Sequence, residues 1–579
     1  MHKPNFAAFL SVPIQKTYLT ALSRRANPTG KAGFRPAPPT HHYAFRHTFS
    51  IFAPYRDFAT YADAVSHFVS PTDDKTDICS VRYTVGITIG CIADAMLNQT
   101  KRQMKKFFAL LALAAAVSSE SFAGGIMTNT NQSPQWIRHI ARGTSLDADA
   151  VYFNPAGTAF MEDGFHFSIG NQFVFQNRRA DITYAPFAMN GGNPTKRFDG
   201  KTFAPLLPNL DLVWKHRRFS VMASVGIGGG GGKAKYNDGL GVFESQFAAL
   251  PAALTQLGIP TSAYSIGCKV HGYQVTYAAN LGLAVRITDW LSFAAQARFN
   301  YVTNCYKGNI GNITVNPTFA PLGLDGSMVG AYDLFTKVAG AMAGTETGAA
   351  AGQYAALVAD KSLDCEQTGW GIAPVLALYF NHGGWSASVK YEFRTAITLT
   401  NKTRIDDTGM YPDGKKTPYD QPALITAALS KRFRDKVTLT AEYHYYFDKD
   451  AHFENALGTD IPKQKLIDGN TMEYVLGVEW DVCKRLLLSC GVQYSDFDVK
   501  DAFHSELGFQ LDALAVGIGG AVKISDKVKF NLGVCHGFYF PHTVTAINAS
   551  TGLDYISRYK RRSTTVSVGF DFKFAKKRK

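Results

Sequence analysis

Residues 563–574, Ser-Thr-Thr-Val-Ser-Val-Gly-Phe-Asp-Phe-Lys-Phe, decide the fold class of this 579-residue chain. Apolar side chains occupy every second position from Val566 to Phe574, and small or polar side chains stand between them. Because successive side chains of a β-strand point to opposite faces, the segment predicts a strand with one apolar and one polar face. Its length suits a tilted strand that crosses a bilayer, which needs about 9–11 residues.

The same alternation recurs from residue 165 onward and predicts fourteen strands. They are 165–177, 206–215, 219–228, 270–286, 291–306, 369–380, 384–400, 422–433, 437–447, 473–480, 486–495, 512–524, 528–540 and 563–574. Short turns follow the even-numbered strands and long loops follow the odd-numbered ones, which is typical of an outer-membrane barrel. The strands of a soluble β-sandwich also alternate between apolar and polar residues, but a sandwich does not require short turns at one end and long loops at the other. We therefore expect an all-β fold, a 14-stranded antiparallel transmembrane β-barrel over 165–574 in the bacterial outer membrane.

The composition agrees with a strand-rich chain. Hydrophobic residues make up 46% of the sequence, charged residues 18% and aromatic residues 13%, which excludes a disordered chain. The 41 Phe, 27 Tyr and 52 Gly favour many strands over a helical bundle. Mean hydropathy near that of a soluble protein does not exclude a membrane barrel, because the inward side chains of a barrel are polar.

A secretory signal peptide is predicted at 104–123, where two lysines precede the apolar run Phe107–Val117 and Ser121-Phe122-Ala123 follows it. Since a signal peptide belongs at the start of a chain, we interpret residues 1–103 as an upstream extension from a wrong gene start, without a fold of its own. The alternatives for 1–103 are a basic nucleic-acid arm or a transit peptide. From Gly124 onward, 46 Lys and Arg face 39 Asp and Glu, so no nucleic-acid partner is implied.

Two of the long loops carry apolar residues at helical spacing and predict helices outside the membrane. The first has Phe243, Phe247, Leu250 and Leu254, interrupted by Pro251. The second has Leu334 and Val338 in an Ala/Gly-rich context. These helices either pack on each other as a cap or form a groove that collects apolar ligands from outside. The sequence leaves both open.

A resemblance to a known family rests on Ala141–Gly157, which contains Asn154-Pro155-Ala156 shortly before the first strand. This run resembles the N-terminal hatch of the FadL/TodX-type outer-membrane transporters, which carry long-chain fatty acids and other hydrophobic compounds. The resemblance extends over essentially all of 124–579. It implies that 124–164 is a hatch that plugs the barrel, with a ligand pocket beside Phe153, Asn154, Pro155 and Ala156.

The resemblance further implies passive, ligand-gated diffusion with a lateral exit at a kink in the third strand. Here that strand runs into Gly228, Gly229, Gly230, Gly231 and Gly232, which permit a bulge; a flexible loop start is the alternative. The expected partners are a hydrophobic small molecule, outer-membrane lipid and lipopolysaccharide, and the barrel assembly machinery, with the chain a monomer. That machinery reads a terminal aromatic residue, whereas here Phe574 is followed by the basic tail 575–579.

A buried carboxylate head group needs a cation, and four basic residues are predicted at the lumen. Arg142 in the hatch is the preferred ligand; Arg298, Lys390 and Arg394 on the strands are either ligands or members of salt bridges with Glu392. No nucleophile motif, dinucleotide fingerprint or C-x-x-C pair supports an enzyme, cofactor or metal site. One competing function is an adhesin or structural barrel that binds a macromolecule through its loops. A second is an outer-membrane acyl hydrolase, although no residue is indicated as its nucleophile.

Three cysteines lie at the predicted outer ends of strands. Cys268–Cys305 and Cys305–Cys365 disulfides are both possible from the sequence, and free thiols are the alternative.

Overall fold

The computed structural model describes residues 126–129, 133–230, 233–256, 258–344, 346–453, 462–548 and 551–575. The extension predicted at 1–103, the signal peptide predicted at 104–123 and residues 576–579 of the tail lie outside the described residues. No helix in the described part of the chain is long and apolar enough to cross a membrane.

Fourteen antiparallel strands form the wall of a closed barrel, as the alternation predicts. Strand β1 pairs with β2 on one side and with β20 on the other, which closes the sheet. In order around the wall the strands are β1 (Gly164–Tyr184), β2 (Thr195–His216), β3 (Phe219–Gly229), β5 (Thr261–Arg286), β6 (Leu291–Phe319), β9 (Lys361–His382), β10 (Trp385–Glu392), β13 (Leu424–Phe433), β14 (Val437–Tyr446), β15 (Met472–Asp481), β16 (Leu486–Asp496), β17 (Ala513–Lys523), β18 (Val528–Tyr539) and β20 (Asp554–Ala575).

Shorter elements lie before the barrel and in its long loops. The helices are α3 (Pro134–His139), α4 (Ala150–Phe153), η1 (Pro155–Phe160), η2 (Ala185–Met189), α5 (Gly241–Glu244), α6 (Leu250–Gln256), η3 (Ala320–Leu322), α7 (Ala331–Ala341), α8 (Glu346–Val358), η4 (Asp448–Asp450), η5 (Lys463–Leu466) and η6 (Asp501–Phe503). The short strands are β4 (Ala234–Tyr236), β7 (Leu324–Asp325), β8 (Val329–Gly330), β11 (Thr398–Asp406), β12 (Lys416–Pro418) and β19 (His542–Ile547).

Several strands are longer than their alternation predicts. β5 has 26 residues and β6 has 29, and much of the loop predicted at 178–205 continues β1 and β2 instead. Backbone pairing continues at these ends although the pattern changes: in β1 the apolar residues Ala180, Ile182 and Tyr184 are now the buried ones. The single strand predicted over 384–400 is wrong, because β10 ends at Glu392 and β11 begins only at Thr398.

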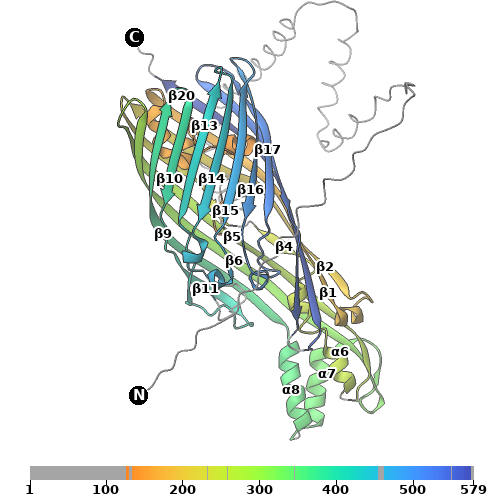
Figure 1. Cartoon of the computed structure of the whole chain (residues 1–579). Helices are drawn as coiled ribbons and strands as arrows, with labels where there is room; N and C mark the ends of the chain where they lie inside the picture. Colours follow the sequence, from red (N-terminus) through yellow and green to blue (C-terminus); the bar gives the residue numbers. More distant parts are fainter. Residues whose placement is uncertain are drawn as a thin grey trace, which may run out of the picture. The chain divides into compact units, whose positions relative to one another are not determined.

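The two ends of the barrel differ, as Figure 1 shows: α6, α7 and α8 lie at the long-loop end, and tight turns join the strands at the other. At this short-turn end, Gly383 and Gly384 connect β9 to β10 with φ values of 61° and 74°. Two successive positive φ angles define a type I′ turn, which matches the twist of the strands it joins.

The outer wall is apolar. Leu281, Ile518 and Trp370 are each more than half exposed, at 65%, 63% and 61%. Contiguous apolar surface of this kind is unfavourable in water, and on a closed barrel it is typical of the lipid-facing band. The strands therefore cross a membrane, and their inward side chains line a polar lumen.

Candidate functional site

Residues 133–160 lie inside the barrel and bond to strands around its wall. Ser133 caps α3 by accepting a hydrogen bond from the Trp136 amide at 3.0 Å. Gln135 on this helix donates to Ser168 Oγ of β1 at 3.2 Å and to Asp571 of β20 at 2.5 Å. Arg138 donates to Glu479 of β15 and Ser489 of β16, each at 2.8 Å, and to Asn531 of β18 at 3.4 Å, so a single short helix is bonded to five strands.

Glycines of the wall make room for α3. A Cβ on Gly491 would collide with the carbonyl of His139, and one on Gly517 would collide with the carbonyl of Ile137. These glycines stand at strand positions where other residue types would pack better. Their place opposite the helix therefore reflects a close approach of two backbones.

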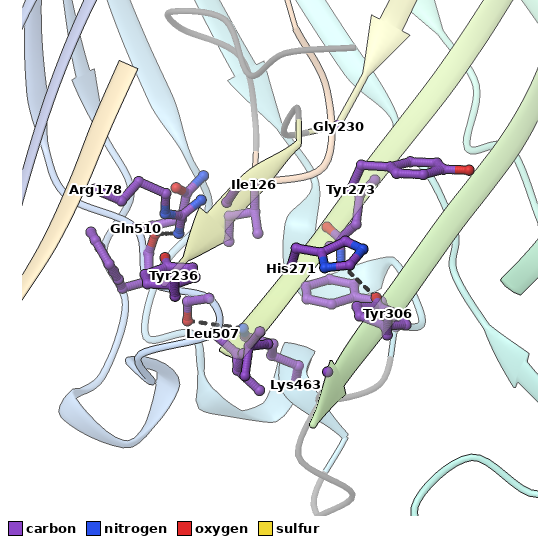
Figure 2. A pocket seen from close by; sticks show the side chains of 18 of the residues that line it. Ile126, Arg178, Gly230, Tyr236, His271, Tyr273, Tyr306, Lys463, Leu507 and Gln510 are labelled. Carbon is purple, nitrogen blue, oxygen red and sulfur yellow. Dashed lines mark hydrogen bonds between the residues drawn. The ribbon is translucent and has the colours of Figure 1, made fainter. Parts of the chain in front are cut away.

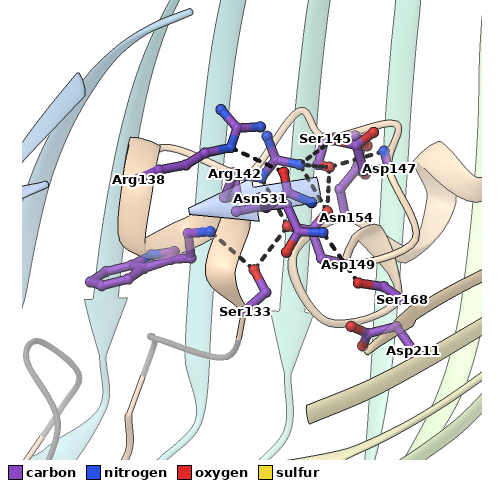
Figure 3. A network of polar contacts seen from close by, with 12 residues as sticks. Ser133, Arg138, Arg142, Ser145, Asp147, Asp149, Asn154, Ser168, Asp211 and Asn531 are labelled. Carbon is purple, nitrogen blue, oxygen red and sulfur yellow. Dashed lines mark hydrogen bonds and ion pairs between the residues drawn. The ribbon is translucent and has the colours of Figure 1, made fainter. Parts of the chain in front are cut away.

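Arg142 is the centre of a buried ion-pair network (Figure 3). Its guanidinium donates to both carboxylate oxygens of Asp149 at 2.9 Å and to Asp147 at 2.9 Å. It also bonds Ser145 Oγ at 2.6 Å and lies 3.4 Å from Glu479. Because three carboxylates already surround it, Arg142 is poorly placed to take a ligand head group. Its position supports a role in holding residues 142–149 folded.

The Asn154-Pro155-Ala156 motif forms a buried turn. The Asn154 side chain accepts from the Gly157 amide at 3.2 Å and donates to the Ser145 carbonyl at 3.3 Å. The Ala156 carbonyl accepts from Ser292 Oγ of β6 at 2.7 Å. Phe153 packs edge-on against Tyr152, with ring centroids 5.0 Å apart. None of the four predicted residues at 153–156 lines either of the two cavities described below.

The strand cations predicted as ligands are held in ion pairs. Arg298 pairs with Glu392 and stacks over the Tyr152 ring, 4.4 Å from its centroid. Lys390 also pairs with Glu392 and donates to the Tyr152 carbonyl at 2.9 Å. Arg394 lies apart from them and bonds Asp420 at 3.1 Å. Salt bridges with Glu392 therefore hold Arg298 and Lys390, and both support Tyr152, whereas Arg394 follows the end of β10 and has Asp420 as its partner.

A cavity of about 260 Å³ lies toward the long-loop end (Figure 2). Its walls come from β1, β4, β5, β6, β9, β16, β17, β18 and β20, from residues 126–129, and from the loops between later strands. Aromatic side chains dominate its apolar part: Tyr236, Phe243, Tyr273, Tyr306, Tyr411, Tyr419, Phe453, Phe497, Phe503, Phe509 and Tyr539. Among these described lining residues there is no Asp or Glu, whereas Arg178, Lys307, Lys361, Lys463 and Arg561 are basic.

Arg178 and Lys463 are two of the cations at this cavity that lie over aromatic rings. Arg178 lies 4.5 Å from the Phe509 ring centroid and donates to the Phe509 carbonyl at 3.3 Å. Lys463 lies 4.2 Å from the Phe503 ring centroid. Removal from water and the cation of Arg178 lower the pKa of Lys463 to about 8. Sequence reasoning missed both residues, because each lies in a segment predicted to be a loop.

Of the predicted site residues, Gly230 and Phe243 do line this cavity. Arg142 borders a different cavity, of about 360 Å³, near the short-turn end. The other residues of the predicted capture groove, Phe247, Leu250, Leu254, Leu334 and Val338, belong to one apolar cluster. The helices of the long loops thus pack as a cap, and these five residues do not form an open groove.

The barrel wall is interrupted beside the cavity. β2 pairs with β3 only from Leu210 to His216, and its next partner is β4, where Lys201 pairs with Lys235. Residues 202–209 of β2 therefore have no partner strand on that side among the described residues, and they include Pro205 and Pro208, which cannot donate a hydrogen bond. These two prolines are the sequence signal for the unpaired stretch.

The glycine run lies at this gap. A bulge between Ile227 and Gly229 shifts the register of β3 against β5. Asn129 donates through its amide to the Gly228 carbonyl at 3.1 Å and through its side chain to the Gly230 carbonyl at 3.3 Å. The predicted bulge is present, and Gly231 and Gly232 lie outside the described residues.

The six cysteines of the described residues are free thiols. Cys305 lies opposite Glu366 and Cys365 lies opposite Tyr306 on the paired strands, so the two cysteines point to different faces. Cys268 lies opposite Ile310, five positions from Cys305. Neither disulfide considered from the sequence is compatible with this register.

The chain matches no protein-family model, and no curated protein matches its sequence. Among solved structures it is similar to a Pseudomonas aeruginosa FadL homologue, with a TM-score of 0.52 and 13% identity over 78% of this chain and 100% of that one. It is also similar to the Pseudomonas putida toluene transporter TodX (TM-score 0.47, 14% identity, 78% and 100% covered) and to the monoaromatic hydrocarbon channel CymD (0.42, 12%, 78% and 99%). The chain has the fold of the FadL-type outer-membrane transporters.

Proposed function

We propose that this protein is an outer-membrane transporter for hydrophobic compounds that carry an anionic head group, long-chain fatty acids foremost. The observation that supports it best is the cavity itself, an aromatic pocket whose charged lining residues are all basic. A buried acyl chain gains about 0.8 kcal/mol per methylene, and a buried carboxylate requires charged donors. Arg178 and Lys463 supply such donors beside Phe509 and Phe503.

Residues 126–129 connect the cavity to the interrupted wall. Ile126, Met127, Thr128 and Asn129 all line the cavity, and Asn129 bonds the glycine run of β3. The Asn129 carbonyl accepts from the Tyr152 hydroxyl at 3.0 Å, which links it to the segment inside the barrel. A ligand that displaces these four residues would break the bonds of Asn129 to the glycine run of β3 and to Tyr152. In this mechanism the segment 133–160 is a hatch, and the ligand leaves through the gap into the membrane without any energy source.

Head-group binding should depend on pH through Lys463. The pKa of Lys463 is about 8, well below the ordinary pKa of a lysine, so its side chain loses its positive charge above about pH 8. A fatty acid is ionised above about pH 5, so affinity should be highest between about pH 6 and 8 and then fall, at most tenfold per pH unit. Titration of oleate against purified protein at pH 6 to 9.5 measures this. Lys463→Arg should remove the fall, because an arginine stays charged; an unchanged fall in that variant would contradict the assignment.

Closing the gap in the wall should stop transport. Leu207 of β2 and Ile227 of β3 pack in one apolar cluster across it, so a disulfide between Leu207→Cys and Ile227→Cys would join the two strands there. We expect uptake of fatty acid by cells to fall to background under oxidising conditions and to recover with a reductant. The variant is made with Cys483 and Cys490, which are exposed, replaced by serine.

The matched control is the pair Leu212→Cys and Ala223→Cys, which lie opposite each other where β2 and β3 are already paired. A disulfide there should leave uptake unchanged. Full uptake with the first disulfide formed would exclude the gap between β2 and β3 as the exit, although the protein would still be a transporter.

We further propose that the protein is a monomer. The barrel assembly machinery inserts it into the outer membrane, where lipid and lipopolysaccharide surround it. A closed sheet leaves no strand edge to recruit a second copy. Phe574 pairs with Phe165 at the end of β20 and is exposed, so an aromatic residue for the assembly machinery stands one residue before the end of that strand.

A further inference from the structure

Positive charge gathers at the short-turn end of the barrel. Three successive hairpins, β13–β14, β15–β16 and β17–β18, end there in turns rich in Lys and Arg. Six exposed cations of these turns form no ion pair among the described residues: Arg434, Lys436, Lys484, Arg485, Lys523 and Lys527. We call these six residues the basic collar. Because β13 to β18 pair in order around the wall, the collar covers one continuous arc.

Aromatic side chains mark the level of the collar relative to the membrane. Phe433 and Trp480, on the strands that lead into these turns, are 46% and 47% exposed. On the neighbouring β10, Trp385 is 46% exposed and lies under the ammonium of Lys431, 4.7 Å from its ring centroid. Exposed aromatic residues near strand ends are typical of the membrane–water interface. The collar therefore lies where lipid head groups begin.

We propose that the basic collar binds the phosphate-bearing head groups of anionic lipids in the leaflet at the short-turn end. Phosphate is the chemistry that an arc of unpaired Lys and Arg recognises, and each cation at a lipid surface is worth about a fivefold change in binding. The 360 Å³ cavity near the short-turn end is also bordered by Lys484, Arg485 and Lys523. Free phosphate bound in that cavity is therefore the other ligand that would offer the same chemistry. Arg434, Lys436 and Lys527 do not line that cavity, which favours the bilayer. This inference does not depend on transport.

The test is native mass spectrometry of the delipidated full chain, titrated with phosphatidylglycerol or phosphatidylcholine in detergent. We expect at least tenfold tighter binding of phosphatidylglycerol, and loss of that preference in Lys436→Gln/Lys484→Gln/Lys527→Gln, which removes one cation per turn. The control Lys402→Gln/Lys415→Gln/Lys416→Gln removes three exposed lysines at the long-loop end and should keep the preference. Both variants should migrate as folded barrels on unheated gels.

Two results would overturn the inference. One is an equal preference for phosphatidylglycerol in the collar variant and the wild type. The other is complete displacement of phosphatidylglycerol by millimolar inorganic phosphate, which would place the bound anion in the 360 Å³ cavity instead of at the lipid surface.

Discussion

Replacing Arg178 and Lys463 together by glutamine should weaken the binding of a long-chain fatty acid about 100-fold. Each residue can offer a charge-assisted hydrogen bond to the carboxylate, and such bonds contribute about 1.5–3 kcal/mol apiece. The apolar part of the cavity remains, because Phe503 and Phe509 are unchanged. Isothermal titration of oleate against the detergent-solubilised protein measures the loss.

A neutral ligand separates this effect from damage to the fold. Toluene fills only the apolar part of the pocket, so its affinity should change by no more than about twofold in the double variant. Lys402→Gln/Lys416→Gln, two lysines outside the cavity, should leave both ligands unaffected. Equal losses for oleate and toluene would mean that the two cations support the shape of the cavity and do not recognise a head group.

Replacing Arg142 by methionine should loosen the segment inside the barrel while the wall survives. Without the guanidinium, Asp149 is left buried and unpaired, and Asp147 and Glu479 lose a cation. Removing one partner of a buried ion-pair network costs about 3–5 kcal/mol. We expect the single-channel conductance in a planar bilayer to rise severalfold, because residues 142–149 no longer hold their place in the lumen.

Arg142→Lys is the matched control, since it keeps the charge but loses the geometry that serves two carboxylates at once. It should give an intermediate conductance. The wall, which closes through the β1–β20 pairing, should keep its resistance to unfolding in detergent. An Arg142→Met variant as closed as the wild type would contradict the role assigned to this network.

The barrel was predictable from the sequence because each strand carries its own signal. In β20, Val566 to Phe574 alternates without a break, and a membrane on one side and a polar lumen on the other require that alternation. The ends of β5 and β6 were not predictable in this way, since beyond the membrane their two faces contact either polar surroundings or the helices of the long loops. There the pairing with a neighbour decides the structure.

The binding cavity was much less predictable. Arg178 and Lys463 are separated by hundreds of residues and meet only because the barrel closes, so no local pattern joins them. The role of Arg142 was easier to predict, because Asp147 and Asp149 follow it closely enough in the sequence for a tight turn to bring the three side chains together. Pro205 and Pro208 likewise indicate an unpaired stretch of β2, although the alternation alone predicts a loop at Pro205 and a strand at Pro208.

Uptake of radiolabelled oleate by cells that lack their own fatty-acid transporter tests the central claim most directly. Cells that express this chain should take up oleate with saturable kinetics, and cells that express equal amounts of assembled Arg178→Gln/Lys463→Gln should take it up at the background rate at low concentration. Equal uptake by the two proteins would contradict the assignment of the basic, aromatic cavity as the binding site for transport.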